Sequence, residues 1–262
     1  MSQPKIRYEA KDGIARITLV DPPANTYSYT MMRELDAAIL DARMDAAVHV
    51  LLIRGEGEKF FCAGADIKML TEADPNFKYN FCLHANETLC RLEQTPKVVI
   101  AALNGHCVGG GLEIALACDL RLAKAGGGKI GLPEINLGVL PGTGGTQRLA
   151  RALGRAKAFE LMATGRTFAF EEALALGLVT EILPGATFDA EVAAYAARFV
   201  PPARASKAAG LIKRAVVSGL EAGFAEGLAI ERELQQRLFE SEDAREGLAA
   251  YVERRPPSFR GR

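Results

Sequence analysis

The chain has 262 residues, of which 49% are hydrophobic and 24% are charged, and its 32 Lys and Arg residues balance its 32 Asp and Glu residues. These numbers are typical of a soluble globular protein, and the balanced charge gives no electrostatic reason to expect nucleic acid or an anionic membrane as a partner. No apolar run approaches the ~20 residues of a membrane-spanning helix, and the polar start MSQPKIRYEAKDG lacks the apolar core of a secretory signal.

Five cysteines lie in apolar surroundings, at positions 62, 82, 90, 107 and 118, without a C-x-x-C pair. An odd number of scattered cysteines is typical of free, buried thiols in a reducing compartment, so we expect a cytoplasmic protein. The three histidines do not have the spacing of metal ligands, so we expect no metal site.

Strand and helix signals alternate along the first half of the chain. Ser28 or Thr30 is placed to cap the first helix. The alternation favours a parallel sheet with helical crossovers. The predicted segments are a strand at 13–20, a helix at 31–48, a strand at 48–55, a loop that passes into a helix at 56–70, a helix at 77–93, a strand at 98–103, a helix at 110–119, a strand at 120–125 and an extended piece at 128–134.

Helical periodicity dominates the second half of the chain. No low-complexity linker separates the two halves, so we predict one structural domain of the α/β class. It has an α/β core with the substrate site over residues 1–185 and a helical C-terminal region for subunit contacts over residues 186–262. The predicted helices lie at 144–163, 170–177, 188–199, 204–218, 221–239 and 242–253, before an irregular tail, RRPPSFRGR.

Two glycine-bearing loops each leave a predicted buried strand and open a helix. They are FCAGAD at 61–66 and CVGGGLE at 107–113. The first amides of a helix have no partner within the helix and carry the positive end of its dipole. Two such loops side by side can direct two N–H groups at one oxygen, and each donor of such an oxyanion hole stabilises developing charge by ~3–4 kcal/mol. Glycine suits this role because a Cβ would block the approach of an acyl group.

Other interpretations of the same residues stay open at this point. Gly109 to Gly111 also suit an ordinary turn or close packing of a helix on the sheet. A dinucleotide site fits less well because no G-x-G-x-x-G follows the first strand, and no G-x-S-x-G elbow indicates a serine hydrolase. His106 and Cys107 are adjacent on a strand end, where their side chains diverge, which argues against a Cys–His nucleophile pair.

Two carboxylates lie in apolar stretches beside these loops. Glu113 lies in the first turn of a predicted helix, where the helix dipole alone would favour a carboxylate. Glu134 follows Pro133 in KIGLPEINLGVLPGTGG. Burial raises the pKa of a carboxyl group toward the range that is useful for proton transfer, so one of the two can act as a base on water while the other donates or shuttles a proton.

Four segments, in this order, closely resemble the enoyl-CoA hydratase/isomerase (crotonase) family: FFCAGADIKML, ALNGHCVGGGLEIALACDLRLA, GLPEINLGVLPGTGGTQRLARALG and EALALGLVTEIL. The resemblance covers nearly the whole chain. It implies a crotonase-like spiral of ββα units with a helical C-terminal region, in place of simple crossovers. It also implies a homo-oligomer, a trimer or a dimer of trimers, with subunit contacts through the C-terminal helices.

The resemblance further implies which residues form the site. The backbone amides of Ala65 and Gly110 would form the oxyanion hole for a CoA thioester carbonyl, and Glu113 and Glu134 would be the catalytic pair that holds one water. The expected reaction is hydration of a 2-enoyl-CoA to a 3-hydroxyacyl-CoA, with no metal and no cofactor, because coenzyme A is part of the substrate. Substrate contacts would come from Ala63, Ala65, Asp66, Ile67, Lys68, Gly110 and Gly142.

Alternatives within and beyond the family follow from the same residues. The presence of both glutamates favours a hydratase over a Δ3-Δ2 enoyl-CoA isomerase, but hydratases of branched or cyclic enoyl-CoA also keep both. A catalytically idle binding protein with this fold is a third possibility, against which the intact glutamate pair argues.

Two features depart from the usual family pattern. The glycine triplet 126–128 places the two glutamates one position further apart than expected, which puts the placement of Glu134 in doubt. Thr26 and Tyr27 stand where small or aliphatic residues are common. We expect Tyr27 to pack against its neighbours and His84 to lie on a helix surface.

Overall fold

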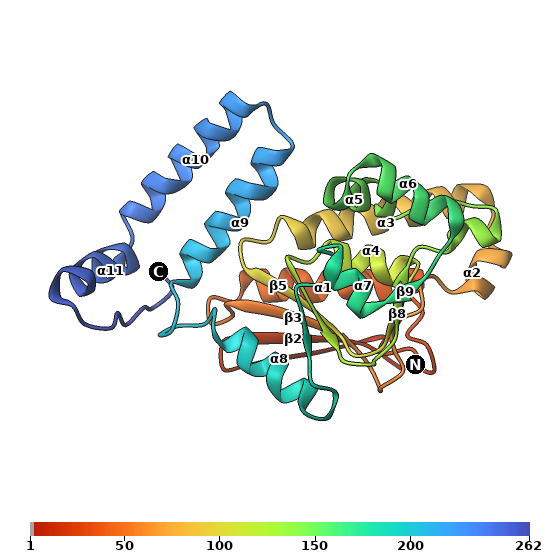
Figure 1. Cartoon of the computed structure of the whole chain (residues 1–262), viewed down its shortest axis with the longest axis horizontal. Coiled ribbons are helices and arrows are strands. Elements are labelled where there is room, and N and C mark those ends of the chain that lie inside the picture. Colours follow the sequence, from red (N-terminus) through yellow and green to blue (C-terminus); the bar gives the residue numbers. More distant parts are fainter. Residues whose placement is uncertain (1–2) are drawn as a thin grey trace.

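Two β-sheets form the centre of the molecule in the computed structural model, which describes residues 3–262 (Figure 1). The larger sheet has the strand order β1-β2-β3-β5-β7-β10. The strands from β2 to β10 run parallel, and β1 pairs antiparallel with β2 at one edge. These strands are β1 (Ile6–Lys11), β2 (Ile14–Leu19), β3 (Val50–Gly55), β5 (Val98–Leu103), β7 (Leu120–Lys124) and β10 (Glu181–Leu183).

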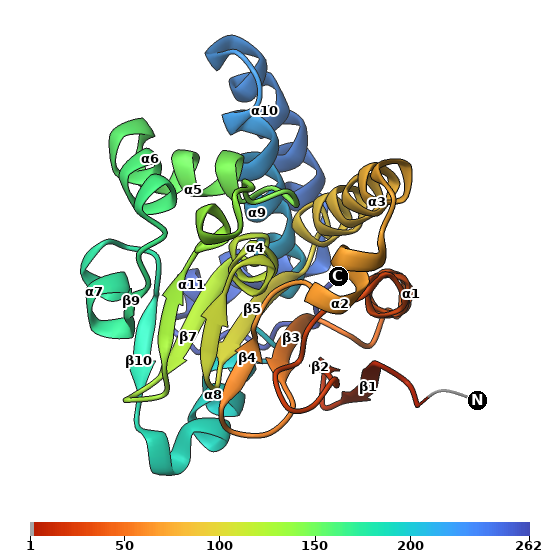
Figure 2. The same cartoon turned by 90° about the vertical axis from the view of Figure 1, so that its right-hand side faces the viewer.

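The smaller sheet has the order β4-β6-β8-β9, in which only β9 is antiparallel. Its strands are β4 (Phe60–Cys62), β6 (His106–Val108), β8 (Lys129–Gly131) and β9 (Phe168–Ala169). Three successive units each place one strand in the larger sheet and the next in the smaller sheet before a helix begins. The helices are α2 (Ile67–Glu72), α4 (Gly110–Leu116) and the 3-10 helix η1 (Glu134–Leu137). This is the expected spiral of ββα units, and Figure 2 shows its strands stacked side by side.

Two buried asparagines hold the bends between the sheets. Asn104 Oδ1 accepts a hydrogen bond from the Gly55 amide (3.0 Å), and its Nδ2 donates to the Gly57 carbonyl (2.8 Å). Asn25 Nδ2 donates to the Glu56 carbonyl (2.9 Å). The Gly55 amide is buried, so it needs the partner that Asn104 supplies, and the two side-chain amides together set the direction of the strand that follows.

The larger sheet has a hydrophobic core on each face. Alternate residues of a strand point to opposite faces. Leu51 and Ile53 of β3 therefore join the core that contains α1 (Tyr29–Met44) and α3 (Pro75–Glu93), whereas Val50 and Leu52 join the core that contains α8 (Phe188–Ala197). Residues 48–55 therefore form a nearly continuous apolar run, because both faces of the strand are covered by a core.

Three helices at the C-terminal end extend beyond the sheets. α9 (Ser206–Leu220) and α10 (Phe224–Phe239) form a projecting hairpin, and α11 (Glu242–Glu253) follows (Figure 1). In the part of the chain that the structure describes, none of the helices has the length and apolarity needed to span a membrane.

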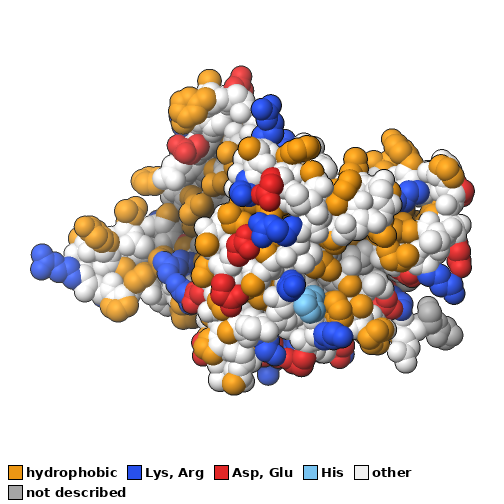
Figure 3. Space-filling model, turned by 45° about the vertical axis from the view of Figure 1, so that its right-hand side comes forward, with side chains coloured by type: hydrophobic (Ala, Val, Ile, Leu, Met, Phe, Trp, Pro, Cys, Tyr) orange, Lys and Arg blue, Asp and Glu red, His pale blue; other side chains and the backbone are white. Residues whose placement is uncertain are grey.

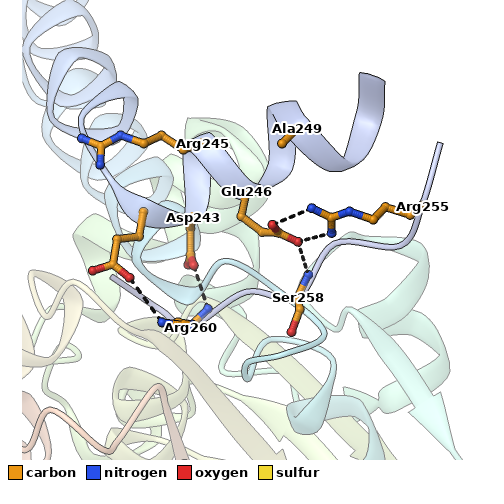
Figure 4. Close-up of a pocket in the computed structure, with 8 residues that line it drawn as sticks. Asp243, Arg245, Glu246, Ala249, Arg255, Ser258 and Arg260 are labelled. Carbon is orange, nitrogen blue, oxygen red and sulfur yellow. Dashed lines mark hydrogen bonds and ion pairs between the residues drawn. The ribbon is translucent and has the colours of Figure 1, made fainter. Parts of the chain in front are cut away.

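The tail that follows α11 folds back along that helix (Figure 4). The Asp243 carboxylate accepts hydrogen bonds from the backbone amides of Arg260 (2.7 Å) and Gly261 (2.8 Å). Glu246 forms an ion pair with Arg255 (2.6 Å). The irregular tail expected from the sequence therefore has a defined path, because the carboxylates of Asp243 and Glu246 on α11 hold its backbone and Arg255.

Several elements differ from the prediction. β1, β4, β6, β9 and β10 are not predicted, and four of them have only two or three residues, too few to show an alternating pattern. The helix expected at 144–163 is two helices, because Gly154 between them has a φ of 77° and ends the first. The remaining helices are α5 (Gly145–Leu153), α6 (Arg155–Thr164), α7 (Phe170–Ala175) and the 3-10 helix η2 (Gly185–Thr187).

Candidate active site

The two glycine-bearing loops lie side by side, because β4 and β6, which precede them, are paired. A Cβ added to Gly64 in the first loop would lie 3.2 Å from the amide nitrogen of Gly110 in the second. Gly64 and Gly109 also have φ values of 97° and 56°, in the region that L side chains rarely adopt. Glycine is therefore needed here both for the backbone conformation and for the close approach of the two loops.

The amides of Ala65 and Gly110 are both available to bind an oxygen. Tyr27 forms a parallel bridge to the first loop, in which its amide donates to the Gly64 carbonyl (3.0 Å) and its carbonyl accepts from the Asp66 amide (3.0 Å). The intervening Ala65 N–H therefore points away from Tyr27. Gly110 begins α4, so its amide has no acceptor within the helix. Within residues 3–262 neither amide donates to another group, as the predicted oxyanion hole requires.

Glu113 is held in one orientation by the loop before α5. Its side chain lies in the first turn of α4, and the residue is only 2% exposed. Oε1 accepts from the amides of Thr143 (2.8 Å) and Gly145 (2.7 Å), and Oε2 accepts from the Thr143 hydroxyl. These donors offset the cost of burying the charge. Because a carboxylate has about four acceptor sites, one remains for a water or a substrate.

Glu134 begins η1 and approaches the second glycine loop. A Cβ on Gly109 would lie 3.0 Å from Glu134 Oε1. Glu134 Oε2 is buried and has no hydrogen-bond partner among the described residues. Burial, and then the charge of Glu113, raise the pKa of Glu134 from 4.5 to about 7. The site thus combines a carboxylate fixed by three donors with a carboxyl group that exchanges its proton near neutral pH.

A hollow of about 520 Å³ lies beside the first loop, where substrate contacts are predicted. Ile67 is 51% exposed, and Lys68 is also exposed at the rim. Asp66 has a structural role as well, because its Oδ1 caps α2 by accepting from the amides of Lys68 (2.9 Å) and Met69 (3.3 Å). Ala63 is half-buried, and its amide donates to the Ala24 carbonyl (3.0 Å). The hollow is lined by Asp66, Lys68, Met69, Glu72, Ala73, Asp74 and Phe77.

The glycine triplet 126–128 lies away from Glu134. It forms the turn between β7 and β8, at the end of β8 that is remote from Glu134, where the Lys129 amide donates to His106 Nδ1 (3.0 Å). β8 then pairs with β6 as far as Gly131. The register of β8 against β6 is therefore set after the triplet, and the extra residue lies within the turn.

Two residues that hold Glu113 are absent from the sequence prediction. In the segment PGTGG, the prediction includes only Gly142, whereas the structure brings the amides of Thr143 and Gly145 to the carboxylate. Gly142 is half-buried, and a Cβ on it would lie 3.2 Å from Cys82 Sγ. The signal available in the sequence is a glycine-rich loop, whose exposed amides suit a buried carboxylate, but nothing local identifies Glu113 as its partner.

The expectations for Tyr27, His84 and the cysteines have different outcomes. Tyr27 is 3% exposed and packs against Phe81, as predicted. His84 is half-buried against the Tyr29 ring, so it is not an open surface residue. All five cysteines are free, but Cys82 is half-buried and Cys90 is exposed, because they lie toward the outer side of α3. Burial raises the pKa of the Cys107 thiol well above its usual range, which does not favour a nucleophile.

Two other hollows lie away from the glutamates. One of about 520 Å³ lies at α11 and is lined by the paired charges of the tail (Figure 4). The other, of about 670 Å³, lies beneath α9 and is mainly apolar, with the ion pair of Lys213 and Asp119 (2.9 Å) in its wall. Across residues 3–262, no group of three or more His, Cys, Asp or Glu side chains has an arrangement that could hold a metal ion.

Comparison with solved structures identifies the class of fold. The crystal structure of "Enoyl-CoA hydrates" from Geobacillus kaustophilus HTA426 is 45% identical to this chain and superimposes with a TM-score of 0.96, over 100% of this chain and 98% of that chain. The ββα spiral with its helical C-terminal region is therefore the crotonase fold.

Sequence comparison identifies the family. The family model described as Enoyl-CoA hydratase/isomerase matches residues 9–262. A probable enoyl-CoA hydratase of Bacillus subtilis strain 168 is 42% identical over 256 residues, which are 95% of each chain. The mitochondrial methylglutaconyl-CoA hydratase of Rattus norvegicus is 36% identical over 241 residues, which are 90% of this chain and 76% of that one. The chain belongs to the enoyl-CoA hydratase/isomerase (crotonase) family and is an enzyme most like the enoyl-CoA hydratases.

Proposed function

We propose that this chain adds water across the 2,3 double bond of a 2-enoyl-CoA to give a 3-hydroxyacyl-CoA. The observation that carries the proposal is the position of Glu113 and Glu134 beside the free amides of Ala65 and Gly110. Hydration of an enoyl thioester needs donors that polarise its carbonyl and groups that move protons to and from water, and the site supplies both. Coenzyme A is part of the substrate, so the proposal includes no further cofactor.

In the proposed reaction, the two amides bind the thioester oxygen and C3 becomes electrophilic. Glu113, an acceptor with one free site, takes a proton from water as the water oxygen bonds to C3. Glu134, which exchanges its proton near neutral pH, donates to C2. Return of the proton from Glu113 to Glu134 restores the pair, so the net change is the addition of one water. The amides act mainly on the enolate-like charge that develops during the reaction, and interactions of this kind raise kcat.

The proposed substrate contacts are those of the first loop and its neighbours. The hollow beside Asp66 and Lys68 supports this placement, because an exposed ammonium at its rim can pair with a phosphate of coenzyme A. Gly142 is proposed to hold the attacking water through its backbone. The other proposed contacts are Ala63, Ala65, Ile67 and Gly110.

The test is hydration of crotonyl-CoA by the purified protein, followed through loss of the ultraviolet absorbance of the conjugated enoyl thioester. Glu113→Gln and Glu134→Gln should each lower kcat by about 10²–10⁴-fold, since each removes a proton-transfer group. Glu171→Gln on α7, an exposed carboxylate outside the site, is the matched control and should retain parent activity. Parent-level hydration by both site variants would refute the assigned roles.

Two outcomes would favour the alternatives. Movement of a 3,4 double bond to the 2,3 position that survives Glu113→Gln, while hydration is lost, would indicate an isomerase. Absence of turnover with enoyl-CoA thioesters of several lengths and branching patterns would indicate a binding protein. The same series of thioesters would show whether the enzyme prefers straight, branched or cyclic acyl groups.

We also propose a homo-oligomer, a trimer or a dimer of trimers, with contacts through the C-terminal helices. Hydrophobic side chains gather on the projecting hairpin (Figure 3). Among them, Ile212 is 60% exposed, Val216 55%, Leu220 76% and Phe224 84%. Contiguous exposed apolar side chains on a projecting element are typical of an interface, and the hollow beneath α9 extends this apolar surface.

The proposed location is the cytoplasm. All five cysteines are free, and three of them are buried. Unpaired thiols in such number are typical of a reducing compartment.

A further inference from the structure

A chain of hydroxyl groups leads from Tyr27 to Glu113. The Tyr27 hydroxyl lies 3.2 Å from Thr143 Oγ1, and Thr143 Oγ1 is in turn hydrogen-bonded to Glu113 Oε2. Tyr27 is 3% exposed, and Thr143 and Glu113 are each 2% exposed. Bulk water therefore does not compete with these hydrogen bonds, and their loss cannot be compensated by solvent.

The direction of this chain follows from the number of protons available. An ionised carboxylate only accepts, so Thr143 must donate its single hydroxyl proton to Glu113. The Thr143 oxygen is then an acceptor, and the Tyr27 hydroxyl donates to it. Burial, and next the charge of Glu113, raise the pKa of Tyr27 well above its usual value, so the phenol keeps the proton that it donates.

Tyr27 also contacts both halves of the oxyanion hole. Its backbone forms the bridge that turns the Ala65 amide outward. Its ring lies against Gly110 so closely that a Cβ on Gly110 would overlap it. One residue therefore touches the first loop, the second loop and, through Thr143, the Glu113 carboxylate.

We infer that Tyr27 and Thr143 are positioning residues, which fix the Glu113 carboxylate relative to the two amides that bind the thioester oxygen. This inference rests on the proposed function. Two backbone amides hold Oε1, and the hydroxyl chain prevents rotation of the carboxylate about that point by holding Oε2. The remaining acceptor site of Glu113 then faces the attacking water at a constant angle, and small misplacements of such a group lower the rate strongly.

Substitutions that remove only the hydroxyl groups test the inference in the purified full-length protein with crotonyl-CoA. Thr143→Val keeps the branched shape and the backbone amide, and it should lower kcat about 10–100-fold with KM changed less than about 2-fold, because a hydrogen bond to a charged group is lost. Tyr27→Phe acts one bond further away and should lower kcat about 3–10-fold. Thr143→Ser restores the hydroxyl and should recover most of the activity.

A double-mutant cycle distinguishes positioning through the chain from two separate structural effects. If Tyr27 acts through Thr143, Tyr27→Phe should not lower kcat further in the Thr143→Val background, whereas independent effects would multiply. The matched controls are Tyr195→Phe on α8 and Thr88→Val on α3. Thr88 is fully buried and its hydroxyl has no partner within residues 3–262, so both controls should match the parent.

An infrared measurement separates failure of this inference from failure of the proposed function. The carboxylate band of Glu113, assigned from the difference between the parent and Glu113→Gln, should shift in Thr143→Val and, by less, in Tyr27→Phe. This shift is expected even if the parent hydrates no enoyl-CoA. The inference would be overturned if the carboxylate band did not shift. It would also be overturned if the parent were active and the variants had the same kcat, or if the two substitutions had multiplying effects in the double-mutant cycle.

Discussion

Glu113 and Glu134 are the same residue type in different surroundings, and this difference supports the roles that we propose for them. Glu113 accepts hydrogen bonds from two backbone amides and one hydroxyl, which hold its carboxylate in place. Glu134 has a buried oxygen without a partner among the described residues, and burial raises its pKa to about 7. The candidate site therefore combines a carboxyl group fixed by three donors with one that exchanges its proton near neutral pH.

The raised pKa of Glu134 predicts a pH-dependent cost to stability. Between pH 4.5 and about 7 the unfolded chain has released this proton while the folded chain still holds it, so the free energy of unfolding falls as the pH rises and the full cost is present above about 7. Glu134→Gln removes the cost and should raise the free energy of unfolding by about 1–3 kcal/mol at pH 8, and by progressively less toward pH 4.5. Urea unfolding of both proteins across this range measures the difference.

The control for this prediction is Glu171→Gln, at an exposed position. The difference in free energy of unfolding between this variant and the parent should stay constant over the same range of pH. The raised pKa would be contradicted if Glu134→Gln increased the free energy of unfolding by the same amount at pH 5 and at pH 8.

At the scale of elements, the site depends on short strands that change sheets. β4 and β6 have three residues each, yet they bring the two glycine loops together. Such short strands have little pairing energy of their own, so the bends before them must be held by other groups. Asn104 and Asn25 do this by hydrogen-bonding the backbone at those bends.

Asn104→Ala should lower the free energy of unfolding by about 1–3 kcal/mol, because it leaves the buried Gly55 amide without the side chain that satisfies it. Asn80→Ala, at an exposed position on α3, is the control and should cost less than about 0.5 kcal/mol. Urea unfolding at one protein concentration measures both. If both variants lost the same free energy of unfolding, the bend would be held by something other than Asn104.

At the scale of the whole molecule, the C-terminal helices α9 and α10 project away from the sheets (Figure 1), and they carry exposed apolar side chains. α8 packs on the larger sheet, so the projecting part begins with α9. The tail is tied to α11 by Asp243 and Glu246, which gives this part a defined shape (Figure 4). A projecting arm with exposed apolar side chains is suited to contact other copies of the chain.

Ile212→Asp should weaken assembly, because it places a charge in the apolar surface of α9 that we propose to be buried between subunits. Sedimentation velocity should show the parent as a trimer or hexamer and the variant shifted to smaller species. Leu174→Asp on α7, another exposed apolar residue (41%), is the control and should sediment like the parent. A parent that sediments as a monomer would refute the proposed assembly.

Much of the chain was predictable because its signals are local. The apolar run at 48–55, the turn before Ser28 and the periodicity of 77–93 each correspond to elements in the structure, and Ser28 does cap α1. Four consecutive motifs identified the family, and the resemblance, together with the carboxylates beside the glycine loops, predicted the residues of the candidate site. These features depend on sequence neighbours, so the sequence by itself determined them.

Other features were decided only by the tertiary structure, because they join residues far apart in the chain. Tyr27, Thr143 and Glu113 form one hydrogen-bonded chain although more than a hundred positions separate Tyr27 from Thr143. The strands β4 and β6 exist only through pairing with each other and their neighbours. The raised pKa of Glu134 likewise comes from burial and from a second carboxylate on another element. Distances and burial of this kind arise when the chain packs, and no local pattern encodes them.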